Sequence, residues 1–314
     1  MTELERRIKA KIPGPDTGIE VRHTMCDICS PGMHCGINAY IKDGKVIKIE
    51  GIDGHPSNDG RLCTKGMANR EYIYREDRIK TPLRRVGKRG EGRFEPISWE
   101  EAYAEIAKGL NRCKEKYGAE SVAFYSGYSK WYRQMLRRLA YAFGSPNYGC
   151  ESSACYTAAF MAWKVAAGEQ GNPDMGHSDL FLGWAFNPFY SSYMGAHSAM
   201  KLKEKGLKFL IVDTRRTPAT EKLADLFLQP KTGTDGALAH AIANVLIEND
   251  WIDRPYIDRY VYGFEEYAAY VKQFNEGNIQ SITGVPYSRV VAAARLIHEN
   301  PGVRNACNGL DVSF

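Results

Sequence analysis

The 314-residue sequence lacks three features that mark common classes of protein. No apolar run approaches the ~20 residues that a membrane helix requires, so we expect no membrane insertion. The pair Arg6-Arg7 has no apolar stretch behind it, so the body of a secretory signal is missing and we expect a cytoplasmic protein. The net charge of +5 is small and forms no concentrated basic stripe, which argues against nucleic-acid binding.

Two further absences narrow the possibilities. The sequence has no Gly-x-Gly-x-x-Gly stretch, which argues against an NAD site. It also shows no internal repeat and no low-complexity segment. Its 44% hydrophobic and 25% charged residues are typical of a globular protein, and its length is sufficient for two modest domains.

Four of the eight cysteines are spaced to hold a metal centre. Cys26, Cys29 and Cys35 lie in one short segment, and Cys63 follows after a predicted hairpin. Such a set can bind one tetrahedral ion or a cubane iron–sulfur cluster. Zinc sites usually use two Cys-x2-Cys pairs, so one compact triple plus a remote cysteine favours the cluster over zinc. In a reducing compartment, metal binding is also favoured over disulfides, which are the third alternative.

The remaining sequence alternates between strand and helix patterns. Asp43-Gly44 between two alternating apolar runs predicts a hairpin, and Ser98 with Glu101 predicts a capping box that opens a helix to about Tyr117. Apolar runs at 180–184 and 208–213 predict buried strands. Helices are predicted at 234–249, 263–275 and 286–299, with a strand from about 303. This βαβ rhythm predicts a doubly wound α/β fold after the cysteine-rich segment.

The stretch Gly60-Arg61-Leu62-Cys63-Thr64-Lys65-Gly66 resembles the opening of the molybdenum and tungsten bis-pterin oxidoreductases, the dimethyl sulfoxide reductase family. Four further stretches are similar to that family in order and spacing, and the likeness covers nearly all of residues 22–314. They are 96–102, 144–147, 213–217 and 232–238. Around 144–155 the sequence is similar to a tungsten-dependent hydratase of the family.

The resemblance implies a division into domains. A small β-rich [4Fe–4S] domain, with an N-terminal arm, would occupy residues 1–78, and Rossmann-like α/β domains would follow. Residues 79–147 would begin one α/β domain, 148–300 would form the nucleotide-binding one, and 301–314 would return into the first. Family catalytic chains are much longer and end in a β-barrel, so we expect an N-terminal half or a split subunit that needs a second chain.

In this family a protein side chain usually ligates the metal shortly after the stretch that corresponds to 144–147. Cys150 and Cys155 are both candidates. Cys155 is favoured because a helix N-terminus lowers a thiol pKa and a thiolate suits a soft metal. Cys150 fits a structural cysteine as well. The resemblance also implies that Lys65 carries electrons between the pterin and the cluster, although lysine at such a position is otherwise a solvated residue.

The motif at 213–217 follows the most apolar predicted strand, where open α/β sheets bind ligands. A carboxylate there can accept from a ribose hydroxyl or a guanine edge, and arginines can bind a pyrophosphate. The resemblance implies a molybdopterin guanine dinucleotide, two of which (bis-MGD) would hold molybdenum or tungsten. The residues implied in its binding are Asn187, Asp213, Arg215, Arg216, Thr217, Gly233, Thr234 and Asp235.

The implied function is two-electron redox or oxygen-atom transfer on a small substrate, with a separate iron–sulfur subunit as a plausible electron partner. The alternative is a non-catalytic cluster-bearing subunit of a respiratory complex. Cys155, Asp213 and Asp235 favour the enzyme, because the non-catalytic subunit would be expected to lack these three residues.

The sequence departs from the family pattern at two places. Five residues separate Cys29 from Cys35 where the family usually has three, and Ser30 replaces the aspartate that the hydratase has, so that residue does not support hydration.

Overall fold

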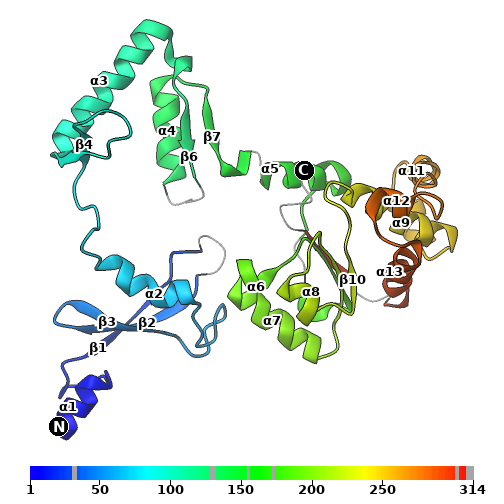
Figure 1. Cartoon of the computed structure of the whole chain (residues 1–314), viewed down its shortest axis with the longest axis horizontal. Coiled ribbons are helices and arrows are strands. Elements are labelled where there is room, and N and C mark those ends of the chain that lie inside the picture. The colour runs from blue at the N-terminus through cyan, green and yellow to red at the C-terminus, as the bar shows by residue number, and fades with distance from the viewer. Residues whose placement is uncertain (30–33, 128–131, 154–155, 172–173, 301–303, 309–314) are drawn as a thin grey trace. The chain divides into compact units, whose positions relative to one another are not determined.

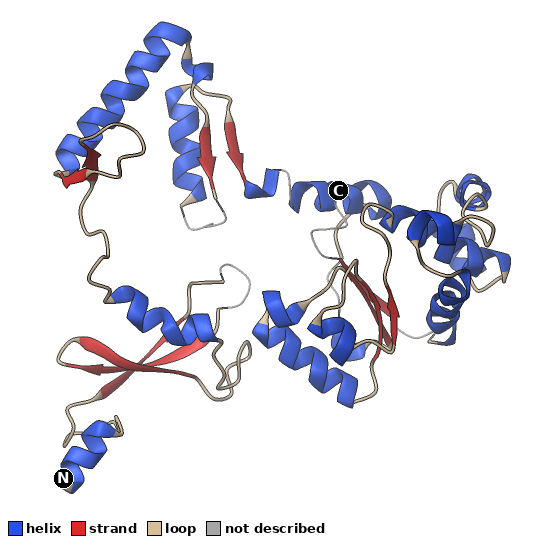
Figure 2. Ribbon diagram, viewed as in Figure 1, coloured by secondary structure: helices blue, strands red, loops and turns tan. Residues whose placement is uncertain are grey.

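A computed structural model describes residues 1–29, 34–127, 132–153, 156–171, 174–300 and 304–308, the last of these as backbone only. The chain divides into two compact units, Met1–Ala154 and Cys155–Phe314, and each is described by itself. Figure 1 labels the elements along the chain, and Figure 2 separates helices from strands. No helix in the described ranges is long and apolar enough to cross a membrane.

The first unit begins with a three-stranded antiparallel sheet in the order β1-β2-β3. Its elements are α1 Glu3–Lys9, β1 Glu20–Met25, β2 Gly36–Lys42, β3 Lys45–Gly51 and α2 Thr64–Ile73. The predicted hairpin is confirmed, and its turn residues Asp43 and Gly44 have φ values of 50° and 72°, as a two-residue turn between twisted strands requires. The buried core consists of Ile37, Ala39 and Ile49. So small a core indicates that this segment depends on a bound metal centre for stability.

The rest of the first unit contains a short antiparallel pair and a short parallel pair. Its elements are β4 Leu83–Arg85, β5 Phe94–Pro96, α3 Trp99–Tyr117, η1 Ala119–Ser121, β6 Phe124–Ser126, α4 Arg133–Phe143, β7 Tyr148–Cys150 and η2 Glu151–Ser153. The predicted capping box is confirmed: Glu101 N–H donates to Ser98 Oγ at 3.1 Å, and Ser98 N–H donates to the Glu101 carboxylate at 2.9 Å. Strand β7 pairs in parallel with β6, and the sequence did not predict it.

The second unit is built on a parallel four-stranded sheet in the order β10-β9-β8-β11. Its strands are β8 Leu180–Trp184, β9 Lys208–Val212, β10 Leu226–Leu228 and β11 Arg304–Asn308. Its helices are α5 Tyr156–Ala167, η3 Met175–His177, α6 Pro188–Ser191, α7 Tyr193–Glu204, α8 Pro218–Lys222, α9 Asp235–Glu248, α10 Arg254–Tyr260, α11 Phe264–Val271, α12 Ile279–Thr283 and α13 Tyr287–Glu299.

Both faces of this sheet are covered. Successive side chains of a strand point to opposite faces, so β9 sends Leu210 and Val212 to one core and Phe209 and Ile211 to the other. The first core also contains side chains of α9 and α13, and the second contains side chains of α7 and α8. Figure 1 shows these two helix groups on opposite faces of the sheet. The doubly wound α/β prediction is therefore confirmed.

Strand β11 lies beside β8, although more than a hundred residues separate them in sequence. The expected return of 301–314 into the first α/β domain remains a prediction. Residues 301–303 and 309–314 lie outside the described residues. The other domain boundaries given above remain predictions.

Gly51, at the end of β3, lies so close to a neighbouring loop that a side chain has no room. A Cβ at this position would lie 2.4 Å from the carbonyl carbon of Gly60 and 2.8 Å from the backbone N of Arg61. We expect Gly51→Ala to lower the unfolding free energy of this segment by about 1–3 kcal/mol, because backbone atoms cannot yield as a flexible side chain can. Thermal unfolding measured together with iron content checks this.

Gly109 provides the matched control for that substitution. It lies inside α3 with no atom within 4 Å of its added Cβ. Gly109→Ala should therefore stabilise the chain by about 1 kcal/mol, as alanine in a helix interior usually does. Equal behaviour of the two variants would contradict the close contact of Gly51 with the loop.

Candidate functional site

The four predicted cluster cysteines flank these elements: Cys26 and Cys29 follow β1, Cys35 directly precedes β2, and Cys63 directly precedes α2. Cys26 N–H donates to the Cys35 carbonyl at 2.9 Å, which continues the pairing of β1 with β2. Cys63 is the N-cap of α2, and its Sγ accepts from Gly66 N–H at 3.5 Å. A Cβ on Gly66 would lie 3.8 Å from the Cys26 Sγ, so the first turn of α2 packs against that thiol.

The thiols lie within electrostatic reach of one another. Burial raises the pKa of Cys26, and Cys29 and Cys63 raise it further. Burial also raises the pKa of Cys35, with additional contributions from Cys26, Cys63 and Cys29. Binding of metal cations to the thiolates would relieve this mutual repulsion. Residues 30–33, including Ser30, lie outside the described residues.

No three His, Cys, Asp or Glu side chains in the described ranges are grouped closely enough to hold a single ion. Four thiolates on one zinc ion share a centre at about 2.3 Å from each sulfur. A cubane cluster instead gives each thiolate its own iron.

Asn58, which the sequence did not mark as a site residue, fixes the loop that carries Cys63. Its side chain is 3% exposed. Its Oδ1 accepts from Gly36 N–H at 2.7 Å, and its Nδ2 donates to the Gly36 carbonyl at 3.1 Å and to the Arg61 carbonyl at 2.7 Å. One buried amide therefore links the residue after Cys35 to the strand-to-helix loop. An asparagine in a polar loop carries no sequence signal for this role.

Lys65, the predicted electron-relay residue, is the second residue of α2 and is exposed. It lies two positions after Cys63, so the backbone places it close to the predicted cluster. Its role between cluster and pterin remains a prediction.

Asp213 and its neighbours follow the carboxyl end of β9, as predicted. Asp213 is 8% exposed, and its Oδ1 accepts from Arg215 N–H at 3.1 Å. Arg215 and Arg216 are both exposed. Thr217 is buried and forms a reciprocal cap with Thr220 at the start of α8, a structural role that was not predicted.

The loop after β10 leads into α9 through Gly233, whose φ is 80°. Thr234 is the N-cap of α9 and donates from its Oγ1 to the Lys231 carbonyl at 2.7 Å. Asp235, the first residue of α9, accepts at Oδ1 from the indole Nε1 of Trp184 at 2.8 Å. Trp184 is the last residue of β8, so it fixes the predicted carboxylate relative to the sheet. No local pattern in the sequence predicts this contact.

Asn187 lies in the loop after β8, and the polar atoms of its side chain lack hydrogen-bond partners within the described residues. Its Oδ1 and Nδ2 are both buried, and neither has a partner in the part of the chain that the structure describes. Buried polar atoms without partners are costly and usually indicate a missing ligand or water. The same loop is tied to β9, because Ala185 N–H donates to the Val212 carbonyl at 2.8 Å with Ala185 at φ 52°.

Asn187, Asp213 and Asp235 are thus brought to the carboxyl edge of three neighbouring parallel strands. This is where open α/β sheets bind extended ligands. An amide that lacks partners, a buried carboxylate and a helix N-terminus fit a nucleotide-bearing cofactor.

The predicted metal ligand Cys155 lies outside the described residues. Its competitor Cys150 ends β7 and is partly buried. Burial alone would raise the pKa of Cys150, but hydrogen bonds from Ser152 and Ser153 and the charge of Arg133 lower it overall. Arg133 also forms an ion pair with Glu151. Cys150 is therefore placed in a polar setting that favours its thiolate.

A cysteine-bearing β-rich segment followed by a parallel α/β sheet with ligand groups at its carboxyl edge defines the class of protein. Residues 19–75 match the family model of the molybdopterin oxidoreductase Fe4S4 domain, and residues 78–293 match that of molybdopterin oxidoreductase. The chain belongs to the molybdopterin oxidoreductase family. Its cofactors are a [4Fe–4S] cluster and a molybdenum or tungsten pterin.

Individual relatives agree with the family match. The chain is 33% identical over 283 residues to the probable oxidoreductase YoaE of Bacillus subtilis, covering 88% of this chain and 41% of the relative. It is 32% identical over 286 residues to the thiosulfate reductase molybdopterin-containing subunit PhsA of Salmonella typhimurium, covering 90% and 37%. Acetylene hydratase from Pelobacter acetylenicus superposes with a TM-score of 0.82 at 26% identity, covering 93% and 40%. The chain spans about two fifths of the length of these relatives.

These matches confirm the predicted family, fold class and cofactor types. They also agree with the predicted likeness to a hydratase of the family, because acetylene hydratase is among the structural matches. They give no support to the alternative of a non-catalytic respiratory subunit.

Proposed function

We propose that this chain forms the cluster-bearing and nucleotide-binding part of a molybdenum or tungsten bis-pterin oxidoreductase. The enzyme would carry out two-electron redox or oxygen-atom transfer on a small substrate. The observation that carries the proposal is Asn187, whose buried amide lacks partners at the sheet edge where Asp213 and Asp235 also lie. A bound pterin dinucleotide would supply the missing hydrogen bonds there.

The residues of this edge suit the two ends of such a ligand. Asp213 is held by its own loop, so its carboxylate is preorganised to accept from a ribose hydroxyl or a guanine edge. Arg215 and Arg216 extend from the same loop and suit a pyrophosphate. Gly233, Thr234 and the N-terminus of α9 add backbone N–H groups that favour an anion. Trp184 keeps Asp235 in place.

The cluster segment would carry electrons to and from the cofactor. Cys26, Cys29, Cys35 and Cys63 would each bind one iron. Lys65 would stabilise the reduced cluster, and Cys155 would ligate the metal of the pterin cofactor. That metal supplies the two-electron chemistry when it is bound. An iron–sulfur electron partner, a second chain or C-terminal half, and a cytoplasmic location belong to the same proposal.

Anaerobic purification of the full-length protein tests the proposal, with analysis of iron, molybdenum, tungsten and zinc and an absorption spectrum. We expect about four irons, brown absorbance and one molybdenum or tungsten. Reduction of the cluster by formate, or its oxidation by thiosulfate, would then show which substrate class the site accepts, since formate dehydrogenase H and a thiosulfate reductase are among the relatives. Zinc as the only metal would contradict the proposal.

A further inference from the structure

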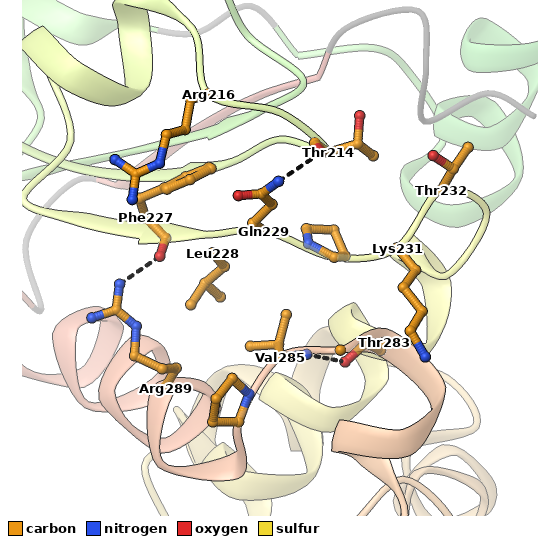
Figure 3. A pocket seen from close by; sticks show the side chains of 13 residues that line it. Thr214, Arg216, Phe227, Leu228, Gln229, Lys231, Thr232, Thr283, Val285 and Arg289 are labelled. Atoms are coloured by element: carbon orange, nitrogen blue, oxygen red, sulfur yellow. Dashed lines mark hydrogen bonds between the residues drawn. The ribbon is translucent and has the colours of Figure 1, made fainter.

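Two grooves of the molecule differ in what surrounds them. The groove in Figure 3 lies beside the edge strand β10, and Thr214, Arg216 and Thr232 from the neighbouring loops line it, so it belongs to the proposed cofactor site. A separate groove, the α2 groove, lies in the first unit between helix α2 and the edge strand β3. Figure 1 shows α2 beside the sheet that contains β3. The α2 groove has a volume of about 440 Å³, within the range of small-molecule sites.

The lining of the α2 groove is largely apolar and includes part of the loop that carries Cys63. Ile49, Leu62 and Met67 contribute to the lining, and Met67 is 52% exposed. Leu62 and Thr64, the residues on either side of Cys63, both line the groove. A ligand in this groove would therefore lie beside the loop of a predicted cluster ligand.

Lys11 lines the α2 groove from the N-terminal arm, in a backbone conformation that lysine seldom adopts. It follows Ala10, the C-cap of α1, and has a φ of 56°. Lys11 N–H donates to the Ile8 carbonyl at 3.0 Å. Ile12 N–H donates to the Arg7 carbonyl at 3.1 Å, which completes a helix ending where glycine is usual. A left-handed lysine costs free energy, so the ending of α1 alone does not explain why this residue is lysine.

The charges of the lining leave two cations for a ligand. Arg70 donates to the Ile47 carbonyl at 2.8 Å, which ties α2 to β3 and uses one of the five donors of its guanidinium. Glu71, the acidic residue of the lining, lies 3.8 Å from Arg70 and is 75% exposed. Lys48 forms an ion pair with Glu50 at 2.7 Å. In the described part of the chain the lysine of the arm has no carboxylate partner, so it and Arg70 are the cations available to an anion.

We propose that the α2 groove binds an anionic flavin of the flavin mononucleotide (FMN) class. The planar ring would lie against the apolar residues of the lining, and the phosphate would lie between Lys11 and Arg70. A ring with one phosphate matches an apolar lining with two available cations. Among planar phosphates, the position beside Cys63 favours one whose ring carries electrons.

This inference rests on the proposed function, because a flavin beside Cys63 has a use only if Cys63 binds the cluster. An oxidised cluster would take one electron from the reduced flavin. The flavin would release one proton to solvent and keep its second electron on the ring. The groove would thus give the cluster a small-molecule electron donor in addition to any protein partner.

The test uses full-length protein of measured iron content, titrated anaerobically with FMN and with riboflavin while flavin fluorescence is followed. Riboflavin has the same ring and lacks the phosphate. We expect one FMN per chain, bound about tenfold more tightly than riboflavin. Added salt should weaken FMN binding and leave riboflavin binding unchanged, because only FMN pairs with the cations.

Three variants locate the two parts of the ligand. Lys11→Gly should weaken FMN binding about tenfold and leave riboflavin binding unchanged, without lowering the melting temperature, because glycine suits the left-handed position. Met67→Gln should weaken the binding of both flavins, because it makes the ring site polar. Lys9→Gln is the matched control, because Lys9 is exposed on α1 and lies outside the groove.

Four results would overturn the proposal. Two concern the unmodified protein: no flavin binds although its iron is present, or FMN and riboflavin bind equally. The other two are full FMN affinity in Lys11→Gly and an equal loss of affinity in Lys9→Gln, because the phosphate would then lie elsewhere. If Met67→Gln loses its iron, Lys11→Gly and the salt dependence decide the question. Iron is measured in every sample, so a missing cluster is recognised as a failure of the proposed function and not of flavin binding.

Discussion

Substitution of Cys63 by alanine is expected to remove the iron–sulfur cluster and, with it, the fold of the segment around residues 19–75. Cys63 would be the ligand that closes the site, and it is also the N-cap of α2. The core cluster of this segment, among the residues that the structure describes, consists of Ile37, Ala39 and Ile49, so little else holds the hairpin and α2 together. We expect the iron content to fall to less than about a tenth of the unmodified value, since a cubane with three protein ligands is readily lost.

Cys113→Ala is the control for this experiment, because Cys113 lies in α3, outside the residues 19–75 that match the Fe4S4 domain. It should retain its iron and its brown absorbance. Iron content and the visible spectrum, measured after anaerobic purification, separate the two variants. If Cys63→Ala kept four irons per chain, the assignment of this residue as a cluster ligand would be wrong.

Asn187→Leu is expected to act in opposite directions on the empty and the loaded protein. In the cofactor-free protein, leucine replaces two buried polar atoms that lack partners. Its melting temperature should rise by about 2–4 °C, because a buried unsatisfied group costs about 1–3 kcal/mol. The loaded protein would lose the amide that satisfies the cofactor, and we expect its pterin and metal content to fall about tenfold or more, since two hydrogen bonds are lost.

Asn244→Leu is the matched control for Asn187→Leu. Asn244 is 1% exposed in α9, where its Oδ1 lacks a partner in the described part of the chain and its Nδ2 donates to Glu248 at 3.0 Å. It lies far along α9 from the cofactor edge, so its substitution should leave cofactor content unchanged. Retention of full cofactor content by Asn187→Leu would remove the observation on which the proposed function rests.

The helices and strands that were predicted correctly are marked by distinctive residues in their own stretch of sequence. The hairpin has Asp43-Gly44, α3 has the capping pair Ser98 and Glu101, and β9 is an apolar run covered on both faces. Strands β7 and β10 were not predicted because each has three residues, too few to show the alternation of apolar and polar residues that indicates a strand. The pairing of β11 with β8 joins distant parts of the sequence, which no local pattern reports.

The sequence predicted which residue types form the site, but it did not predict the hydrogen bonds that hold them in place. Residue types and spacing indicated the cluster cysteines and the motif at 213–217, which the structure places at the end of β9. The contact of Trp184 with Asp235 spans 51 positions, and that of Asn58 with Gly36 spans 22. Such hydrogen bonds depend on how the chain folds back, so these two positioning residues became visible only in the structure.

The position of β11 also bears on the order in which the second unit forms during synthesis. Strand β8 gains β9 as a neighbour soon after both have left the ribosome, but its other edge is paired only by residues 304–308. In the interval the nascent sheet exposes an unpaired apolar edge, the kind of surface that promotes aggregation. We therefore expect chaperones to bind the nascent chain chiefly between completion of β9 and emergence of β11, and to dissociate once that last strand has docked.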